Sequence, residues 1–315
     1  MAVRALDRSA LSVDDLTAIY VVMVQCHVES NAEEPYRSLA ETGAYLRHPP
    51  GFEPRYSWLA ERGGECQGFA QLGVVDGSAA GSVEILVRPD ARRQGNGRAL
   101  LAVVREQATQ LGCRVLIGSH GTAPGASFAA WAGAVDTRRD VRSLLRLPCS
   151  AEARQINGYS LFNWVGAAPD HLVESFARTR DAINDAPRAA DEEWAAWDAE
   201  RIRDLEAVLE QRGREVRVTV ALDTGGSVVA FTELRVSKTQ GARASTEDTA
   251  VLAGHRRKGL GRWVKVESLR RLEVDRPDVS LVTTTNAEDN TAMLTLNRAL
   301  AFRPVAYSTT CVLDL

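Results

Sequence analysis

The stretch GHRRKGLGRWVK, from Gly254 to Lys265, holds three glycines and six basic residues, counting the histidine, in twelve positions. It follows the apolar run TAVLA and leads into WVKVESLRRL, which has the periodicity of a helix. This order predicts a strand, a glycine-rich loop and a helix N-terminus. A helix N-terminus offers unpaired N–H groups to a phosphate, and glycines let the backbone come close to it.

A second copy of this stretch occurs earlier in the chain, within VRPDARRQGNGRALLAVV. Matching Arg92 to Arg256 gives an offset of 164 residues (256 − 92), about half of the 315-residue chain. Duplication of a single-domain unit is the natural inference. We place the boundary near Ser150, which predicts one domain over residues 1–150 and another over 151–315.

The surroundings of the two copies agree with a duplication. In both halves the apolar patterns predict a hairpin, a strand, a helix, a strand, a helix and a strand, in that order. The second-half elements are strands at 215–222, 227–236, 248–253, 279–285 and 305–315, and helices at 261–272 and 290–300. The first-half elements are strands at 55–62, 66–75, 82–88 and 114–119, and a helix at 97–111. Helices at 13–27, 34–47, 171–183 and 192–211 precede the hairpins, the last with Asp191 as its cap and Trp194 and Trp197 on one face.

Composition excludes several classes of protein. A net charge of −3 argues against wholesale nucleic-acid binding, which normally needs a basic domain. The chain shows neither an apolar run long enough to cross a bilayer nor an export signal, so we expect a cytoplasmic protein without a membrane partner. Its five cysteines are scattered without a CxxC pair, and with only five histidines the sequence predicts no metal site.

Spacing separates the two glycine loops from the common nucleotide motifs. The P-loop pattern GxxxxGK[ST] is absent, and the dinucleotide pattern GxGxxG fails because Leu100 and Val264 occupy its third glycine position. Both copies satisfy Arg-x-x-Gly-x-Gly directly after an apolar strand. A single such loop is usually only a tight turn, so the duplicate carries most of the weight.

This motif, with TTTNAEDNTAMLTLNRALAF downstream, resembles the GNAT superfamily of N-acyltransferases, and both halves together resemble a tandem GNAT protein of the mycothiol-synthase and actinomycete biosynthetic type. The resemblance implies an α+β fold of two domains, each a mixed, mostly antiparallel sheet flanked by helices. It also implies acetyl-CoA, or another acyl-CoA, held through its pyrophosphate by the loop and through its pantetheine arm by the preceding strand. The residues assigned to these roles are Val87, Arg92, Arg93, Gln94, Gly95, Asn96, Gly97 and Arg98 in the first half, and Val251, Arg256, Arg257, Lys258, Gly259, Leu260, Gly261, Arg262, Asn286 and Asn290 in the second.

The resemblance further implies that the second half carries out the chemistry. Glu247 opens the strand on which the family places its general base. The family's acid tyrosine is replaced by Asn297, which cannot donate a proton as an acid, and Ala301 replaces a glycine; Tyr307 downstream is the substitute candidate. In the first half, Glu84 is read as an exposed strand residue, and the helix after the fifth strand is rich in alanine and glycine.

These observations predict an acyl-CoA-dependent acyltransferase that modifies an amine or hydroxyl of a small molecule. The first alternative is a non-catalytic acyl-CoA-binding protein, which Asn297 favours. The second is nucleic-acid binding through the arginine loops. The acceptor, the acyl-chain length and the oligomeric state stay open, because the acceptor pocket would be built by residues 169–211, which carry no diagnostic pattern.

Overall fold

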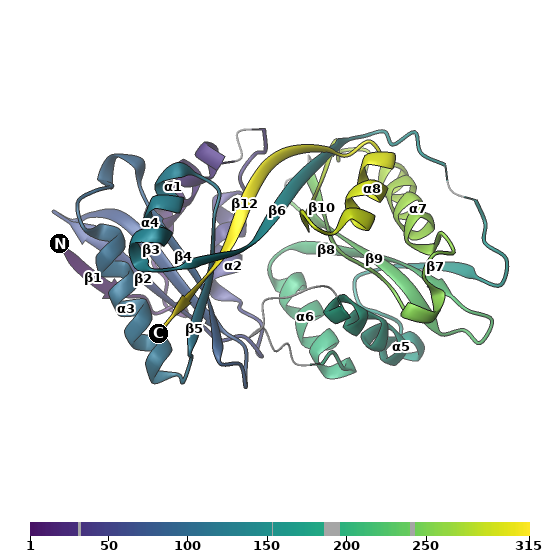
Figure 1. Cartoon of the computed structure of the whole chain (residues 1–315), viewed down its shortest axis with the longest axis horizontal. Coiled ribbons are helices and arrows are strands. Elements are labelled where there is room, and N and C mark those ends of the chain that lie inside the picture. Colours follow the sequence, from purple (N-terminus) through teal and green to yellow (C-terminus); the bar gives the residue numbers. More distant parts are fainter. Residues whose placement is uncertain (31–32, 153, 186–195, 240–242) are drawn as a thin grey trace. The chain divides into compact units, whose positions relative to one another are not determined.

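The computed structural model describes residues 1–30, 33–152, 154–185, 196–239 and 243–315 (Figure 1). Contacts between residues group the chain into two compact units. Unit 1 contains Met1–Asp140 and Ala306–Leu315, and unit 2 contains the other described residues, all between Val141 and Val305. The predicted division at residues 150 and 151 stays a prediction.

Unit 1 is built around a sheet in the strand order β1-β2-β3-β4-β5-β12-β6. The pairs from β1 to β4 and the pair β5–β12 are antiparallel, while β4 and β5 run parallel. The elements are β1 (Ala2–Ala5), α1 (Val13–Ser30), α2 (Leu39–Arg47), β2 (Arg55–Arg62), β3 (Glu65–Val74), β4 (Ala80–Val87), α3 (Asn96–Gln110), β5 (Val115–His120), α4 (Ala123–Ala132) and the first part of β6 (Val135–Arg146).

Unit 2 repeats this plan with the strand order β6-β11-β10-β9-β8-β7. Strands β10 and β11 run parallel, and the pairs from β7 to β10 are antiparallel. The elements are β7 (Ser160–Val165), α5 (Asp170–Asp181), α6 (Ala199–Gln211), β8 (Arg214–Leu222), β9 (Val228–Ser237), β10 (Arg243–Val251), α7 (Leu260–Asp275), β11 (Leu281–Ala287), α8 (Thr291–Ala299) and the start of β12 (Arg303–Asp314). The predicted α+β fold class is confirmed.

The last strands of the two halves change places. The end of β12, from Thr309 to Asp314, pairs with β5 of unit 1, and the later residues of β6 belong to unit 2, where β11 is their neighbour. Cys311 and Leu313 are thereby buried in unit 1, and Leu145 in unit 2. The sequence analysis predicted a final strand but not its partner, because an apolar pattern specifies which face is buried and not which strand lies alongside.

Two predicted helix starts were wrong. The helix predicted from residue 34 begins at Leu39, because Ser38 and Glu41 form a reciprocal capping box. The helix predicted from residue 192 begins at Ala199, because Asp198 accepts a hydrogen bond from the backbone N–H of Arg201 and caps it. Trp197 therefore precedes the helix, and the predicted cap Asp191 and Trp194 lie outside the described residues.

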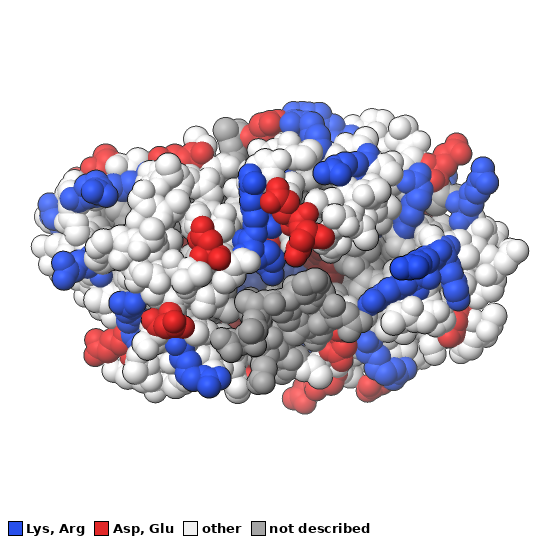
Figure 2. Space-filling model, in the orientation of Figure 1, with Lys and Arg blue, Asp and Glu red and all other residues white. Residues whose placement is uncertain are grey.

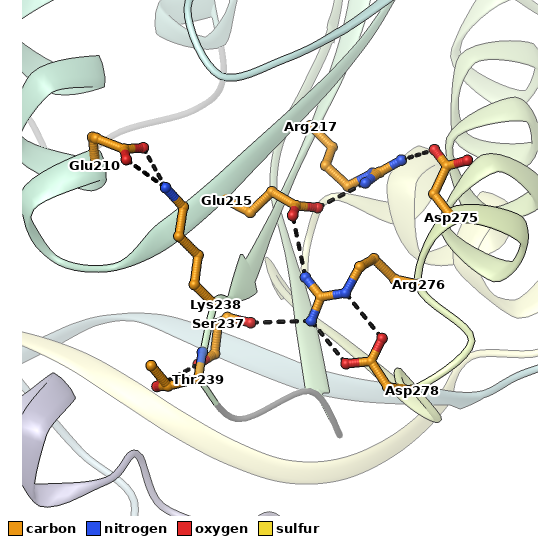
Figure 3. Close-up of polar contacts among 9 residues, drawn as sticks. All are labelled: Glu210, Glu215, Arg217, Ser237, Lys238, Thr239, Asp275, Arg276 and Asp278. Carbon is orange, nitrogen blue, oxygen red and sulfur yellow. Dashed lines mark hydrogen bonds and ion pairs between the residues drawn. The ribbon is translucent and has the colours of Figure 1, made fainter.

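An ionic network fixes the C-terminal end of α7 against β8 (Figure 3). Arg217 is bonded by both Glu215, at 2.7 Å, and Asp275 of α7. Arg276 bonds Asp278 at 2.8 Å and Glu215 at 3.3 Å. Because a helix is stiff over four turns, anchoring this end also positions the opposite end of α7, which carries the second glycine loop.

Acidic and basic side chains are both spread over the molecular face shown in Figure 2. Within the described parts of the chain, the structure contains no helix with the length and apolarity that crossing a membrane requires.

Candidate active site

The two glycine loops have the same backbone conformation. The second arginine of each loop, Arg93 or Arg257, lies in the left-handed region with φ of 59° and 61°. The glycine that caps the following helix, Gly95 or Gly259, has φ of 87° in both copies. Glycine alone adopts this conformation readily, so the fold of the loop requires these two residues.

The first arginine of each loop bonds back to the strand that precedes it. Arg92 donates Nε–H to the carbonyl of Val87 at 3.3 Å, and Arg256 donates Nε–H to the carbonyl of Val251 at 2.9 Å. These bonds close each loop against its strand. The first N–H groups of a helix have no partner within it, so the starts of α3 and α7 offer the donors that a phosphate site needs.

Open space next to the capping glycines agrees with such a site. A Cβ placed on Gly95 would meet no atom within 4 Å, and one placed on Gly259 would meet only the end of Ile156, at 3.5 Å. Most residues of the two loops, 92–98 and 256–262, are exposed. The buried ones are Asn96 and Leu260, and the half-buried ones are Arg92, Gly97, Gly261 and Arg262. This open space is what the two predicted pyrophosphate sites require.

The first loop is partly engaged by its own unit. Arg92 forms a two-bond ion pair with Glu29 of α1, at 3.0 and 2.5 Å. Gln94 accepts a hydrogen bond from Arg62 at 2.9 Å. Asn96 donates its amide to a carbonyl inside the turn. These contacts use side chains that the sequence analysis assigned to CoA and make the first loop a well-anchored structural element.

The second loop is tied to the segment before β7. Lys258 donates to the hydroxyl of Tyr159 at 2.8 Å, and the same hydroxyl lies 2.9 Å from Nδ1 of His255. Arg262 donates to the carbonyl of Glu152 at 3.1 Å. This segment therefore borders the entrance to the N-terminus of α7.

In each unit the two parallel strands separate after a short pairing. Strands β4 and β5 pair as far as Ser82 opposite Ile117, and β10 and β11 pair as far as Thr246 opposite Thr284. Beyond these positions, one edge of β4 and of β10 has no neighbouring strand among the described residues. An unpaired strand edge next to a helix N-terminus is the arrangement expected for an extended ligand bound alongside the backbone.

Unit 2 has a β-bulge where its strands separate. Thr246 lies opposite Leu234 of β9 and Thr249 opposite Thr232, so β10 carries one residue more than its partner, within the pair Glu247 and Asp248. The equivalent pair β3–β4 runs without a shift. A bulge re-aims side chains and often lies beside an active site.

A buried ionic cluster holds this bulge in place. Arg180 of α5, 3% exposed, bonds Glu233 at 2.7 Å and Asp248 at 2.8 Å. Arg235 bonds Glu233 at 2.7 Å, and its guanidinium lies 3.6 Å from the exposed carboxylate of Glu247. Burial alone would raise the pKa of Glu233, but Arg180 and Arg235 lower that pKa to about 2. Burial raises the pKa of Asp248 despite its bond to Arg180.

Glu84 occupies the comparable place in unit 1, two residues beyond the last β4–β5 pair. Its side chain is open to solvent, as the sequence analysis expected. Desolvation by the surrounding protein nevertheless raises the pKa of this carboxyl, with the positive charges of Arg37 and Arg55 acting in the opposite direction. Each unit therefore has a carboxylate beside its separated strands.

A buried polar chain links α7, α8 and β11 in unit 2. Lys265, 3% exposed, donates to Oδ1 of Asn297 at 2.8 Å. Asn297, 1% exposed, donates its amide N–H to Oδ1 of Asn286 at 2.7 Å. Burial lowers the pKa of Lys265 to about 7. The sequence analysis singled out both asparagines but treated Lys265 as an ordinary helix residue.

Asn290 and Ala301 bound the helix that carries Asn297. Asn290 accepts a hydrogen bond from the backbone N–H of Met293 at 3.1 Å and so caps α8. Ala301, which replaces the family's glycine, takes φ of 64°, so the left-handed turn is kept without glycine.

Tyr307, the predicted acid, is grouped with unit 1, whereas Glu247 is grouped with unit 2. The guanidinium of Arg139 lies over its ring, 4.4 Å from the centroid, and the side chain is 46% exposed. These contacts are those of a surface tyrosine on a strand.

Three possible metal ligands converge in unit 1, although the sequence predicted no metal site. Ligand atoms of His120, Asp136 and Cys311 lie within 4.8 Å of one another on β5, β6 and β12. Nε2 of His120 is 2.9 Å from the carboxylate of Asp136, which is exposed, while burial raises the pKa of the Cys311 thiol. A His–Asp hydrogen bond beside a buried thiol accounts for this geometry without a metal.

Comparison with known proteins defines the class of this chain. A sequence profile of the Acetyltransferase (GNAT) family matches residues 16–128. The mycothiol acetyltransferase of Kineococcus radiotolerans is 31% identical over 242 residues, which cover 74% of this chain and 71% of that protein. The chain belongs to the GNAT family and is an acetyltransferase, and members of this family use an acyl-CoA.

Solved structures confirm the tandem arrangement. A tandem GNAT protein from the clavulanic acid biosynthesis pathway, solved without AcCoA, matches with a TM-score of 0.83 and 26% identity over 99% of this chain and 98% of that one. A GCN5-related N-acetyltransferase from Sphaerobacter thermophilus has the same fold, with a TM-score of 0.70 and 16% identity over 99% of this chain and 95% of that one.

Proposed function

We propose that this chain transfers an acetyl group from acetyl-CoA to an amine or hydroxyl of a small molecule, and that residues 151–315 carry out the chemistry. Residues 1–150 bind CoA mainly as part of the fold. The observation that supports this division best is the asymmetry at the separated strands. Unit 2 has a bulge with two carboxylates and a buried polar chain there, whereas unit 1 has a regular strand pair and a single carboxylate.

The donor substrate would be held by the second loop and by β10. Backbone N–H groups after Gly259 would bind the pyrophosphate, with Arg257 and Lys258 adding positive charge. The free edge of β10 near Val251 would hydrogen-bond the pantetheine arm. This places the thioester near the bulge, because β10 leads from Glu247 to Val251 and then into the loop.

Glu247 is the proposed general base. It is exposed, so an acceptor can reach it, and its carboxylate accepts a hydrogen bond from Ser245 at 2.5 Å. Arg235 and Ser245 fix its orientation. Asp248 is less suited to the role because its carboxylate is bonded to Arg180. Removing a proton from the acceptor ammonium would give the free amine that attacks the thioester.

Two routes can supply the proton that the CoA thiolate needs. Tyr307 is the acid proposed from the sequence. Alternatively, water protonates the thiolate after a hydrogen-bond donor has stabilised it, which needs no acidic side chain. A non-catalytic acyl-CoA-binding protein, the alternative favoured by Asn297, would need neither route.

The experiment combines binding and turnover. Acetyl-CoA binding is measured by calorimetry, and release of the CoA thiol is followed with a panel of amines and alcohols that begins with unacetylated mycothiol, because the relatives are named mycothiol acetyltransferases. Turnover with one acceptor, lost in Gly259→Asp, supports the proposal. Tight binding without turnover for any acceptor would instead support the non-catalytic alternative.

A further inference from the structure

Lys265 is an unusual residue to bury. It is 3% exposed, its ammonium bonds the amide oxygen of Asn297, and within the described residues no carboxylate pairs with it. A ring contact with Phe302, at 5.3 Å from the centroid, is its other favourable interaction. Burying an ammonium without a counter-charge is costly, so a chain that keeps one there gains something other than stability.

The first half of the chain shows that the fold does not need this polar pair. The repeat offset of 164 residues places Leu101 at the position of Lys265, and Leu101 lies in the apolar core of unit 1. Gly133 and Ala301 both take positive φ just after their helices. Counting back four residues from each places Ala129 at the position of Asn297. Leucine and alanine therefore stand at these two positions in unit 1.

While Lys265 is charged, the hydrogen bonds that link it to Asn297 and Asn286 can run in only one direction. An ammonium has donors and no acceptor, so the atom of Asn297 that faces Lys265 must be its oxygen. The amide nitrogen of Asn297 then faces Asn286, whose oxygen must accept. The remaining group of Asn286, its NH2, is left as a donor. Lys265 thus determines the orientation of the Asn286 amide through the two hydrogen bonds made by Asn297.

The free donor lies where the parallel strands separate. Asn286 is two residues beyond Thr284, the last residue of β11 paired with β10, and it is half-buried. Within the described residues, the structure gives its amide nitrogen no hydrogen-bond partner. An oriented, half-buried N–H donor at this place is suited to a ligand atom that becomes negative.

We propose that Lys265, Asn297 and Asn286 form a one-way hydrogen-bond chain that presents the Asn286 amide to the sulfur of the acyl donor and stabilises the CoA thiolate as it leaves. This inference rests on the proposed function. Asn286 is the catalytic residue, because it would touch the sulfur, and Lys265 and Asn297 are positioning residues.

The step balances without an acidic side chain. The acceptor nitrogen forms a bond to the acyl carbon, and the carbon–sulfur bond breaks with its electron pair going to sulfur. The Asn286 N–H donates a hydrogen bond to this thiolate and keeps its proton. The proton released by the acceptor leaves through the base, and water delivers one to the thiolate, so the products are the acylated acceptor and CoA thiol.

Protonation of Lys265 tunes the chain. While the ammonium is charged, the orientation of both asparagines is enforced. A neutral amine has a lone pair and can accept, so Asn297 can then flip and Asn286 loses its fixed direction. Because the pKa of Lys265 is lowered to about 7, the orienting effect is strongest below neutral pH and weakens as the pH rises through 7.

The test measures the acidity of the thiol in bound CoA, from the ultraviolet absorbance of its thiolate. It uses the full-length chain carrying Gly95→Asp, so that the second loop provides the CoA site. Near pH 7, where a large fraction of Lys265 is still charged, we expect a shift in the ionisation of the bound thiol equivalent to about one pH unit, which gives a thiolate fraction about tenfold that of free CoA. Asn286→Ala should remove this shift. Lys265→Met should remove most of it, and Lys265→Gln, which keeps an N–H donor, should restore part.

Calorimetry of CoA binding separates the possible failures. Leu101→Met, the matched change in the first half, should alter neither affinity nor thiol acidity. The inference would be overturned if Asn286→Ala still binds CoA and leaves the thiol acidity unchanged. The proposed function would stay intact in that case, provided that Gly259→Asp abolishes CoA binding. If Gly259→Asp has no effect on CoA binding in the Gly95→Asp chain, both fail together. If Asn286→Ala lowers turnover without changing the thiol acidity, the Asn286 amide would act on the thioester carbonyl and not on the sulfur, which also overturns the inference.

Discussion

Replacing Lys265 by methionine should change how stability depends on pH, because the lysine is buried as a base with a lowered pKa. The pKa falls from 10.5 to about 7 in the folded chain. Between these values the unfolded chain binds a proton that the folded chain does not, so the free energy of unfolding rises with pH. Below about pH 7 both states are protonated, and the full cost of burying the charge is present.

The magnitude follows from the size of the pKa change. At about 1.4 kcal/mol per unit, the free energy of unfolding of the wild type should rise by about 3 kcal/mol more than that of Lys265→Met between about pH 7 and pH 9.5. At neutral pH the methionine variant should be the more stable of the two. Part of this gain is offset by about 1–3 kcal/mol, because Asn297 loses its partner.

The assay is urea unfolding at a series of pH values, with stability of the variant subtracted from that of the wild type at each pH. Subtraction removes the titration of all other groups. Lys238→Met, at an exposed lysine, controls for the loss of one positive charge from the chain. A difference between wild type and Lys265→Met that stays constant from pH 7 to pH 9.5 would refute the reasoning, because it would mean that Lys265 titrates alike in both states.

Two further predictions concern the loops and the buried ionic cluster. Gly261→Asp should abolish turnover, because it brings a carboxylate to the pyrophosphate site. Gly95→Asp should instead lower the melting temperature and the amount of bound acetyl-CoA, with turnover falling only as far as folding falls. Thermal unfolding and thiol release, measured together on both variants, distinguish these two outcomes. Arg180→Met leaves Glu233 buried with one partner fewer and should cost about 3–5 kcal/mol in urea unfolding at neutral pH. Because the pKa of Glu233 is lowered to about 2, its stabilisation, about 3 kcal/mol, is complete above pH 4.5 and should be lost as the pH falls from 4.5 to 2; an acid titration in which wild type and Arg180→Met lose stability in parallel would contradict this.

Much of the fold could be predicted from local sequence. The glycine loops, the duplicated order of elements and the hairpin at residues 223–226 all depend on short-range patterns, and the structure confirms them. Helix starts were less predictable, because the capping residue Ser38 competes with other polar residues nearby. The exchange of the last strands was not predictable, since β5 and the end of β12 are almost 200 residues apart and meet only through tertiary packing.

The candidate site divides in the same way. Glu247, Asn286 and Asn290 follow from their positions in the family's motif, and whether they act as proposed stays a prediction. Arg180 carries no signal in the sequence, because its role arises from packing of α5 against β9 and β10. Lys265 could have been found by aligning the two copies, because Leu101 occupies the equivalent position in the first one.

The most direct test of the central claim, that the second half of the chain carries out acetyl transfer, is the rate of CoA thiol release by Glu247→Gln and Glu84→Gln with the same acceptor. The two variants remove the carboxylates that lie beside the separated strands of units 2 and 1, and melting curves establish that both are folded. We predict that Glu247→Gln loses at least about 100-fold in kcat, the lower end of what a general base contributes, while Glu84→Gln keeps the wild-type rate. Loss of turnover in Glu84→Gln with wild-type turnover in Glu247→Gln would contradict the account and assign the chemistry to the first half.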